Sequence, residues 1–207
     1  MPQKLAPRRQ PQQARSRERV ERILAATAEL VQQRGLAAVN TNAIAKRAGL
    51  PVGTLYQFFP NREAVLKAVM QTQLEKFDEA VVPLLSASED EQPLGEQVDR
   101  IVDALSKAYL AVPGLATLLQ SMKSEPALAA SSAENNARIA AVLAELVRRR
   151  VPALSPKRAR AISTAAVEAA DGVLMMWLKT RDRALLVELK VMLRAYGAQL
   201  LAAAARG

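Results

Sequence analysis

The chain has 207 residues, of which half are apolar and only 3% aromatic, so aliphatic and alanine side chains must fill its core. Cysteine and histidine are both absent. Their absence excludes disulfides, Cys or His zinc sites, thiol nucleophiles and a Ser-His-Asp triad, and we expect no enzyme, cofactor or metal site. No uncharged apolar run approaches about 18 residues and no signal peptide is recognisable, which favours a cytoplasmic protein without a membrane span.

The positive charge is concentrated in the first third of the chain. Lys and Arg number 29 against 20 Asp and Glu, a net charge of +9. Residues 1–67 hold 12 basic and 4 acidic side chains, whereas residues 68–207 hold 17 and 16. This asymmetry indicates a polyanion-binding module joined to a nearly neutral body. The alternative interpretation is a basic tail that serves only solubility.

Periodicity and capping residues predict an all-α fold. Residues 1–15 are rich in Pro, Gln and Arg and are expected to form a flexible basic arm. Ser16, Thr41 and Asn61 are the expected N-caps of helices, and Gly35 and Gly49 the expected ends of two of them. The nine predicted helices cover about residues 16–35, 41–49, 52–58, 61–85, 94–111, 115–123, 126–150, 156–180 and 183–205.

Residues 41–59, with the sequence TNAIAKRAGLPVGTLYQFF, carry the strongest functional signal. Two short helices joined by a Gly-containing turn are typical of a helix-turn-helix. Ala45 and Ala48 are small enough for the two helices to cross closely. Thr54 and Gln57 of the second helix are expected to face outward, toward a groove of DNA.

This segment resembles the DNA-binding domain of TetR-family transcriptional repressors, over about residues 16–67. The resemblance implies a helix-turn-helix domain over 16–67, followed by a helical ligand-binding and dimerisation domain over 68–207. The motif residues that carry it are Thr41, Ile44-Ala45, Ala48-Gly49, Gly53-Thr54-Leu55-Tyr56, Phe58-Phe59 and Arg62-Glu63.

The resemblance places a DNA-binding surface on this domain. The hydroxyls of Thr41 and Tyr56 suit phosphates, and Thr54 suits a base edge. Pro51, Val52 and Phe58 depart from the family pattern. Pro51 has no N–H, and the side chains of Val52 and Phe58 donate no hydrogen bond. Phe58 could equally belong to the core. The residues expected at the DNA are Thr41, Lys46, Arg47, Val52, Gly53, Thr54, Tyr56, Gln57, Phe58 and Arg62.

The resemblance also implies an internal ligand pocket and a homodimer built from the last two helices. Glu168 and Asp171 could hold a cation in that pocket, or pair across the dimer with a basic residue such as Arg194. The residues expected to line the pocket, with ordinary core packing as the alternative for each, are Phe77, Tyr109, Leu118, Met122, Glu168, Asp171, Met175 and Trp177.

These patterns predict a ligand-responsive transcriptional regulator that binds double-stranded DNA as a dimer. We expect a repressor that a small apolar or amphipathic inducer releases from a pseudo-palindromic operator. The alternative function is a basic helical scaffold or membrane-surface protein, which would bind without sequence specificity.

Overall fold

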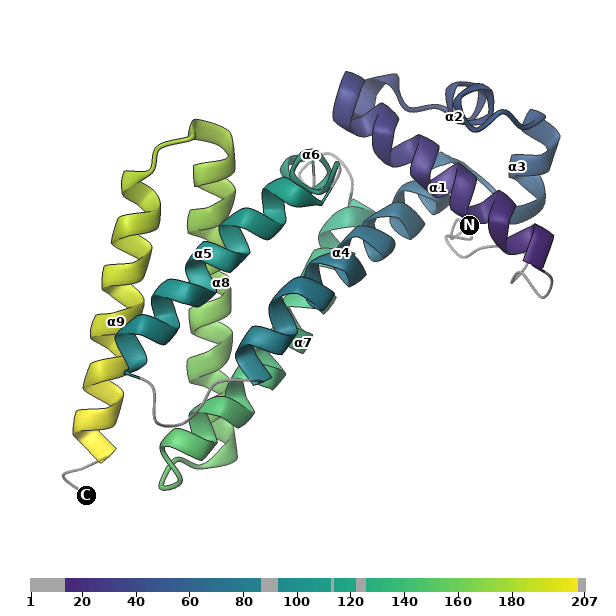
Figure 1. Ribbon diagram of the computed structural model, residues 1–207. Coiled ribbons are helices and arrows are strands. Elements are labelled where there is room, and N and C mark those ends of the chain that lie inside the picture. Colours follow the sequence, from purple (N-terminus) through teal and green to yellow (C-terminus); the bar gives the residue numbers. More distant parts are fainter. Residues whose placement is uncertain (1–13, 87–92, 113, 122–125, 205–207) are drawn as a thin grey trace. The chain divides into compact units, whose positions relative to one another are not determined.

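The computed structural model describes residues 14–86, 93–112, 114–121 and 126–204, and all its regular elements there are helical. The all-α prediction is therefore confirmed. In chain order (Figure 1) the elements are α1 (Ala14–Arg34), η1 (Leu36–Ala38), α2 (Thr41–Ala48), α3 (Val52–Phe58), α4 (Arg62–Ser86), α5 (Leu94–Ala111), α6 (Leu115–Gln120), α7 (Pro126–Arg150), α8 (Pro156–Thr180) and α9 (Ala184–Ala204).

Helix α1 begins earlier than its sequence predicts. It starts at Ala14, so Ser16 lies inside the helix and does not cap it, and Arg15 belongs to the helix and not to an arm. The rest of the expected arm, residues 1–13, lies outside the described residues. Gly35 follows the end of α1 with φ 72°, as predicted, and the chain then forms the single 3-10 turn η1. The sequence missed η1 because three residues are too few to show a periodicity.

The two ends of α2 are set by an asparagine and a glycine. The Oδ1 atom of Asn40 accepts a hydrogen bond from the backbone N–H of Ala43 at 2.9 Å, so Asn40 is the N-cap and Thr41 is the first helical residue. The prediction that Thr41 is the cap was therefore wrong by one position, since Asn serves there as well as Thr. Gly49 ends the helix at φ 63° and ψ 39°, as predicted, in the left-handed region that glycine adopts without strain.

Side-chain caps also begin two of the long helices. The Oδ1 atom of Asn61 accepts from the backbone N–H of Ala64 at 2.8 Å, which confirms Asn61 as the cap of α4. At α8, the Oγ atom of Ser155 accepts from the backbone N–H of Arg158, and Pro156 occupies the first turn.

The helices divide into two compact units. One comprises Met1–Glu75 and Val112–Ser132, and the other comprises Lys76–Ala111 and Ala133–Gly207. Helix α6 therefore belongs with α1, α2 and α3, although it lies far from them in sequence. The contact is close: a Cβ atom on Gly114 would lie 2.9 Å from the carbonyl oxygen of Ala28 in α1.

The first unit is built around α1, which packs along α2 (Figure 1). Ile23 and Val31 of α1, Ile44 of α2 and Leu55 of α3 have no solvent exposure. A charge-assisted hydrogen bond reinforces this core, since the guanidinium of Arg22 donates to the carbonyl oxygen of Ala48 at 2.7 Å. The C-terminal carbonyls of a helix attract a cation, so Arg22 ties α1 to the end of α2.

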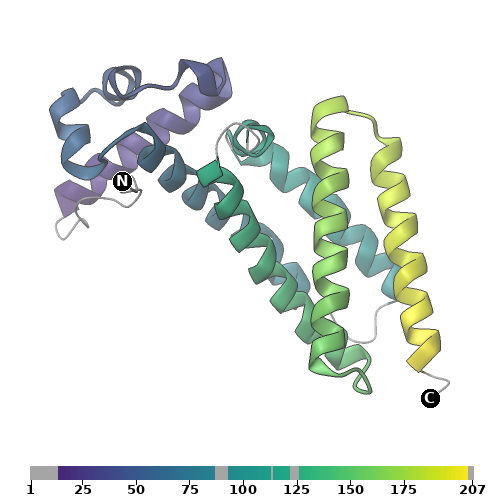
Figure 2. The ribbon, with the colours of Figure 1, turned by 180° about the vertical axis from the view of Figure 1, so that it is seen from behind.

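The second unit contains α5, α8, α9 and parts of α4 and α7. Helices α8 and α9 lie side by side and antiparallel, as both views show (Figures 1 and 2), and α5 packs against α9. Two ion pairs join α5 to α9. The side-chain nitrogen of Lys190 lies 2.7 Å from a carboxylate oxygen of Asp103, and that of Arg194 lies 2.7 Å from one of Asp99. Arg194 thus has a partner within its own chain.

Among the described helices, α8 alone is long and apolar enough to cross a membrane by the criteria of length and composition. The core helices of soluble proteins meet the same criteria. Glu168 and Asp171 lie near the middle of α8, where a charged side chain would be costly in a bilayer.

We predict that Gly114→Ala destabilises the protein. Gly114 adopts φ 75°, and the added Cβ atom would meet the Ala28 backbone, which cannot move as a flexible side chain can. The dihedral penalty alone is about 1–2 kcal/mol, so thermal unfolding should shift to lower temperature. Gly95→Ala is the control, because its Cβ would make only an ordinary contact at 3.5 Å with Arg194. Equal melting temperatures for the two variants would contradict the close α1–α6 contact.

Candidate nucleic-acid interface and ligand cavity

Helix α3 presents one face to the core and the other to solvent. Leu55 and Phe58 are 0% and 4% exposed, whereas Val52 and Tyr56 are 39% and 42% exposed. The exposed residues recur one helical turn apart, so they share one face of α3. Gly53 and Gln57 extend that face, and Thr54 is half-buried at its edge. This outer face of α3, formed by Val52, Gly53, Thr54, Tyr56 and Gln57, comprises five of the predicted DNA-binding residues.

A pair of hydroxyl groups lies beside this face. The Oγ1 atom of Thr41 and the phenolic oxygen of Tyr56 are 3.2 Å apart, within hydrogen-bonding distance. Thr41 is the first residue of α2, where the backbone N–H groups are free of intrahelical partners. Two hydroxyl donors and the positive end of a helix dipole therefore converge on one place, which is the chemistry that binds a phosphate.

The three predicted basic contacts have different surroundings. Lys46 is exposed. The Nε atom of Arg47 donates to the Oε2 atom of Glu29 at 2.8 Å, in an exposed ion pair of the kind that is worth little and exchanges readily. Arg62 instead donates from Nε to the carbonyl oxygen of Val39 at 2.7 Å, and from Nη2 to that of Leu36. Its guanidinium is therefore engaged with the backbone around η1, which the sequence could not indicate.

Phe58 belongs to the core, which corrects its place among the expected DNA contacts. Its side chain is 4% exposed, and that of Phe59 is 1% exposed. The reason is the helical period: Phe58 lies three residues after the fully buried Leu55, and so on the inner face of α3. A ring in that position has no surface to offer a DNA groove.

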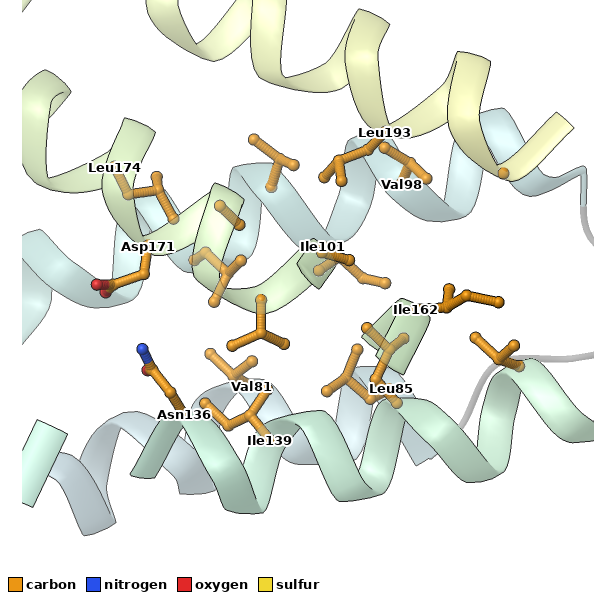
Figure 3. A pocket seen from close by; sticks show the side chains of 18 of the residues that line it. Val81, Leu85, Val98, Ile101, Asn136, Ile139, Ile162, Asp171, Leu174 and Leu193 are labelled. Atoms are coloured by element: carbon orange, nitrogen blue, oxygen red, sulfur yellow. The ribbon is translucent and has the colours of Figure 1, made fainter. Parts of the chain in front are cut away.

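The second unit contains a partly open cavity of about 170 Å³ (Figure 3). Its walls come from α4, α5, α7, α8 and α9, and they are mainly aliphatic, with the aromatic side chains of Phe77, Tyr109 and Tyr196 among them. A single water molecule needs only about 10–15 Å³ of such space, so the cavity is far larger than a hydration site. Figure 3 shows that Asp171 and Asn136 lie at one end of the cavity, whereas Leu85 and Ile162 lie toward the other.

Three of the predicted pocket residues line this cavity, namely Phe77, Tyr109 and Asp171. Glu168 is exposed on α8, and its Oε1 atom accepts a hydrogen bond from Asn136 at 3.4 Å. Asn136 therefore connects Glu168 to the polar end of the cavity, although Glu168 does not line it.

The other predicted pocket residues lie elsewhere. Leu118 is buried in α6, within the first unit. Trp177 is 6% exposed and packs beneath the guanidinium of Arg181, whose central carbon lies 5.7 Å from the ring centroid. Met175 is half-buried outside the lining, and Met122 lies outside the described residues.

Most of the lining residues were not predicted. They are aliphatic side chains such as Val98 and Ile101 of α5 and Ile139 of α7. In the sequence, these residues have the same spacing as ordinary core residues. Only the packing of the five helices decides which apolar side chains line the cavity and which pack against one another in the core.

The polar end of the cavity has unusual electrostatics. The phenolic hydroxyl of Tyr109 donates to the Oδ1 atom of Asp171 at 3.3 Å. Burial raises the pKa of the Asp171 carboxyl, and the nearby charge of Glu168 adds to this rise, while hydrogen bonds from Tyr109 and Asn136 oppose it. Burial and the Asp171 carboxylate raise the pKa of Tyr109 well above its ordinary value, so the phenol stays protonated and remains a donor.

Models of two protein families match two separate parts of the chain. One, described as bacterial regulatory proteins of the tetR family, matches residues 23–69, and the other, described as the tetracyclin repressor-like C-terminal domain, matches residues 93–196. The chain belongs to the TetR family. It is therefore a DNA-binding transcriptional regulator, in a family whose fold is typically not enzymatic.

Relatives with curated descriptions match a short part of the chain. The HTH-type transcriptional repressors KstR of Mycolicibacterium smegmatis and of Rhodococcus jostii are each 40% identical over 62 residues. These matches cover 30% of this chain, which spans only about 30% of the length of those curated relatives.

Solved structures match over nearly the whole chain. A TetR-family regulator from Streptomyces coelicolor is 27% identical, with a TM-score of 0.65, over 88% of this chain and 99% of that one. The fatty acid degradation regulator FadR from Bacillus halodurans is 20% identical, with a TM-score of 0.64, over 88% and 94%, and so shares the fold.

We predict that Asp171→Asn stabilises the protein at neutral pH. Because the pKa of Asp171 is raised in the folded state, its ionised form opposes folding, and an uncharged amide of the same shape removes that penalty. The gain in unfolding free energy should be present at pH 7. It should shrink as the pH falls through the raised pKa and vanish toward the ordinary Asp value of about 3.9, where both folded and unfolded chains are protonated.

Urea unfolding at several pH values measures this gain. Glu145→Gln on α7 is the matched control, since that carboxylate is 67% exposed and should give no comparable pH-dependent gain. If Asp171→Asn were less stable than the wild type at pH 7, the raised pKa would be refuted.

Proposed function

We propose that this protein is a repressor that binds a pseudo-palindromic operator as a homodimer and is released from it by a small apolar or amphipathic molecule. The observation that carries the proposal is the outer face of α3 with the Thr41–Tyr56 hydroxyl pair beside it. The names of the curated relatives, which are transcriptional repressors, support the direction of regulation.

In this proposal α3 enters the major groove of DNA. Thr54 and Gln57 contact base edges, and the side chain of Val52 is placed to contact a thymine methyl group. Thr41 and Tyr56 hold one phosphate, while Lys46 and Arg47 attract the backbone nearby. Gly53 leaves the helix surface open, since no atom lies within 4 Å of the position its Cβ would take. The groove can therefore approach the backbone of α3 closely.

A second copy of the chain is the proposed partner of α8 and α9. Val187 and Val191 of α9 are 56% and 52% exposed, and they lie one turn apart on a single face. Met176 of α8 and Met192 of α9 add further exposed apolar surface, at 51% and 44%. An exposed apolar patch that spans two adjacent helices suits a self-complementary, two-fold interface. Such a dimer presents two copies of α3 to successive major grooves.

The cavity is the proposed effector site. A ligand that binds more tightly to the form of the dimer with low DNA affinity shifts the population toward that form. By reciprocity, operator DNA must weaken ligand binding by the same factor. The protein acts where its operator lies, in the cytoplasm.

We predict that Tyr56→Phe and Thr54→Ala affect DNA binding in different ways. Tyr56→Phe removes a phosphate donor, so affinity should fall for every DNA sequence without a change in base preference. Thr54→Ala should relax the preference at one position in each half-site, at a cost of about 1–3 kcal/mol. Selection of binding sites from random DNA, followed by titration of the selected duplex, measures both effects.

Arg148→Ala is the control for these two variants. Arg148 is an exposed cation at the end of α7 that pairs with Glu145, so its loss should leave operator affinity unchanged. Identical selected motifs for Thr54→Ala and the wild type would refute the base-reading role of Thr54.

We further predict that Val191→Asp dissociates the dimer. A carboxylate at the centre of an apolar interface would be buried without a partner, and sedimentation should then detect monomers that bind the operator weakly. Leu110→Asp is the matched control, because Leu110 is also 52% exposed but lies on α5. If the Val191→Asp variant remained a dimer and the Leu110→Asp variant became a monomer, the interface would lie elsewhere than on this face of α9.

A further inference from the structure

The carboxylate of Asp171 lies at one end of a mainly apolar cavity without a neutralising partner. No ion pair to Asp171 occurs among the residues that the structure describes. Its polar neighbours are the hydroxyl of Tyr109 and the amide of Asn136, which are both uncharged. Two neutral donors reduce the cost of this partly buried charge but do not neutralise it.

The other charges around this end of the cavity increase the negative potential. Glu168 is close enough to Asp171 to raise the pKa of its carboxyl, and Asp78 similarly acts on Tyr109. Asp78 is paired with Arg138 at 2.7 Å. Lys190 and Arg194, which also form ion pairs within this unit, are held by carboxylates of α5.

Aromatic rings lie next to the same carboxylate. The rings of Phe77 and Tyr109 are 4.6 Å apart between centroids and are tilted by 34°, and both side chains line the cavity with Asp171. The face of an aromatic ring attracts cations, most strongly where water is excluded. A free carboxylate and two aromatic rings therefore favour the same class of ligand group.

We propose that the cavity binds an elongated aliphatic molecule that ends in a protonated amine, with the ammonium group at Asp171 and the hydrocarbon along the aliphatic walls. This inference rests on the proposed function, in which the cavity is the effector site, and it names the chemical class of the effector.

The same geometry selects against the other amphiphiles of similar shape. A fatty acid would bring its carboxylate against that of Asp171, and like charges repel strongly where screening is weak. A long-chain alcohol could donate one hydrogen bond to the Asp171 carboxylate, which would leave the net charge of the site in place. Only a cation both donates a hydrogen bond and neutralises the carboxylate, because both partners of that bond then carry charge.

Three ligands with the same chain and different head groups test the proposal: octylammonium, 1-octanol and octanoate. Isothermal titration calorimetry at neutral pH should give octylammonium the highest affinity, by about tenfold over 1-octanol, and octanoate the lowest. Asp171→Asn should lose about this tenfold advantage for octylammonium and leave 1-octanol binding unchanged. Glu145→Gln, which removes the same charge from an exposed site on α7, should change neither affinity.

Acidification of the wild-type protein provides a second measurement that needs no variant. Protonation of Asp171 should weaken octylammonium binding as the pH falls through the raised pKa of that carboxyl, while 1-octanol binding stays constant. The groups that face Asp171 are Tyr109 of α5, Asn136 of α7 and Glu168 of α8. Glu168 is exposed and outside the cavity, so Glu168→Gln should retain most of the preference for the cation.

The possible outcomes separate this inference from the proposed function. Equal binding of octylammonium and 1-octanol, or an Asp171→Asn variant that keeps the preference for octylammonium, would overturn the amine inference and leave the cavity as a ligand site. Failure of all three ligands to bind would overturn both. Tight, Asp171-dependent binding of octylammonium that leaves the affinity for operator DNA unchanged would support the amine site and refute the ligand-responsive repressor.

Discussion

A helix of seven residues is not stable alone in water, so the presentation of α3 to DNA requires the burial of its inner face. Leu55 and Phe58 of α3, together with Phe59 just after it, bury large apolar side chains in the core of the first unit. The same burial fixes the rotation of α3 about its axis, because once one face of the helix is held in the core, the residues on the opposite face must point to solvent. Tyr56 and Val52 are exposed for this reason.

The first unit also uses basic side chains to complete its own backbone. Arg22 donates to the carbonyl oxygen at the end of α2, and Arg62 donates to the carbonyls around η1. Such contacts give charged donors to carbonyl groups at and beside the ends of short helices, where intrahelical partners are few. The number of basic residues in the sequence therefore overstates the number of side chains that are available to bind DNA phosphates. Lys46 and Arg47 are exposed and keep that capacity.

The second unit has a different balance, in which stability and ligand chemistry oppose each other. Asp171 stands at the edge of an aliphatic cavity, where burial disfavours its charge, and a neutral side chain of the same shape would fold more favourably. Strained or uncompensated groups of this kind concentrate at functional sites. Tyr109, which donates to Asp171 and stacks near Phe77, holds the carboxylate in a fixed orientation that an incoming cation can meet without rearrangement.

The sequence by itself determined the all-α class, the helix-turn-helix register and most helix boundaries. These features depend on neighbours in the chain: Asn61 caps the helix that follows it, and Gly49 ends the helix that precedes it. The order of motif residues from Thr41 to Glu63 likewise identified the family. Tertiary structure decided what distant residues do to one another. It buried Phe58, engaged Arg62 with the backbone, packed α6 against α1, and selected which aliphatic residues surround the cavity. Local sequence cannot specify these outcomes, because a side chain's burial and partners depend on helices that are brought together only by folding.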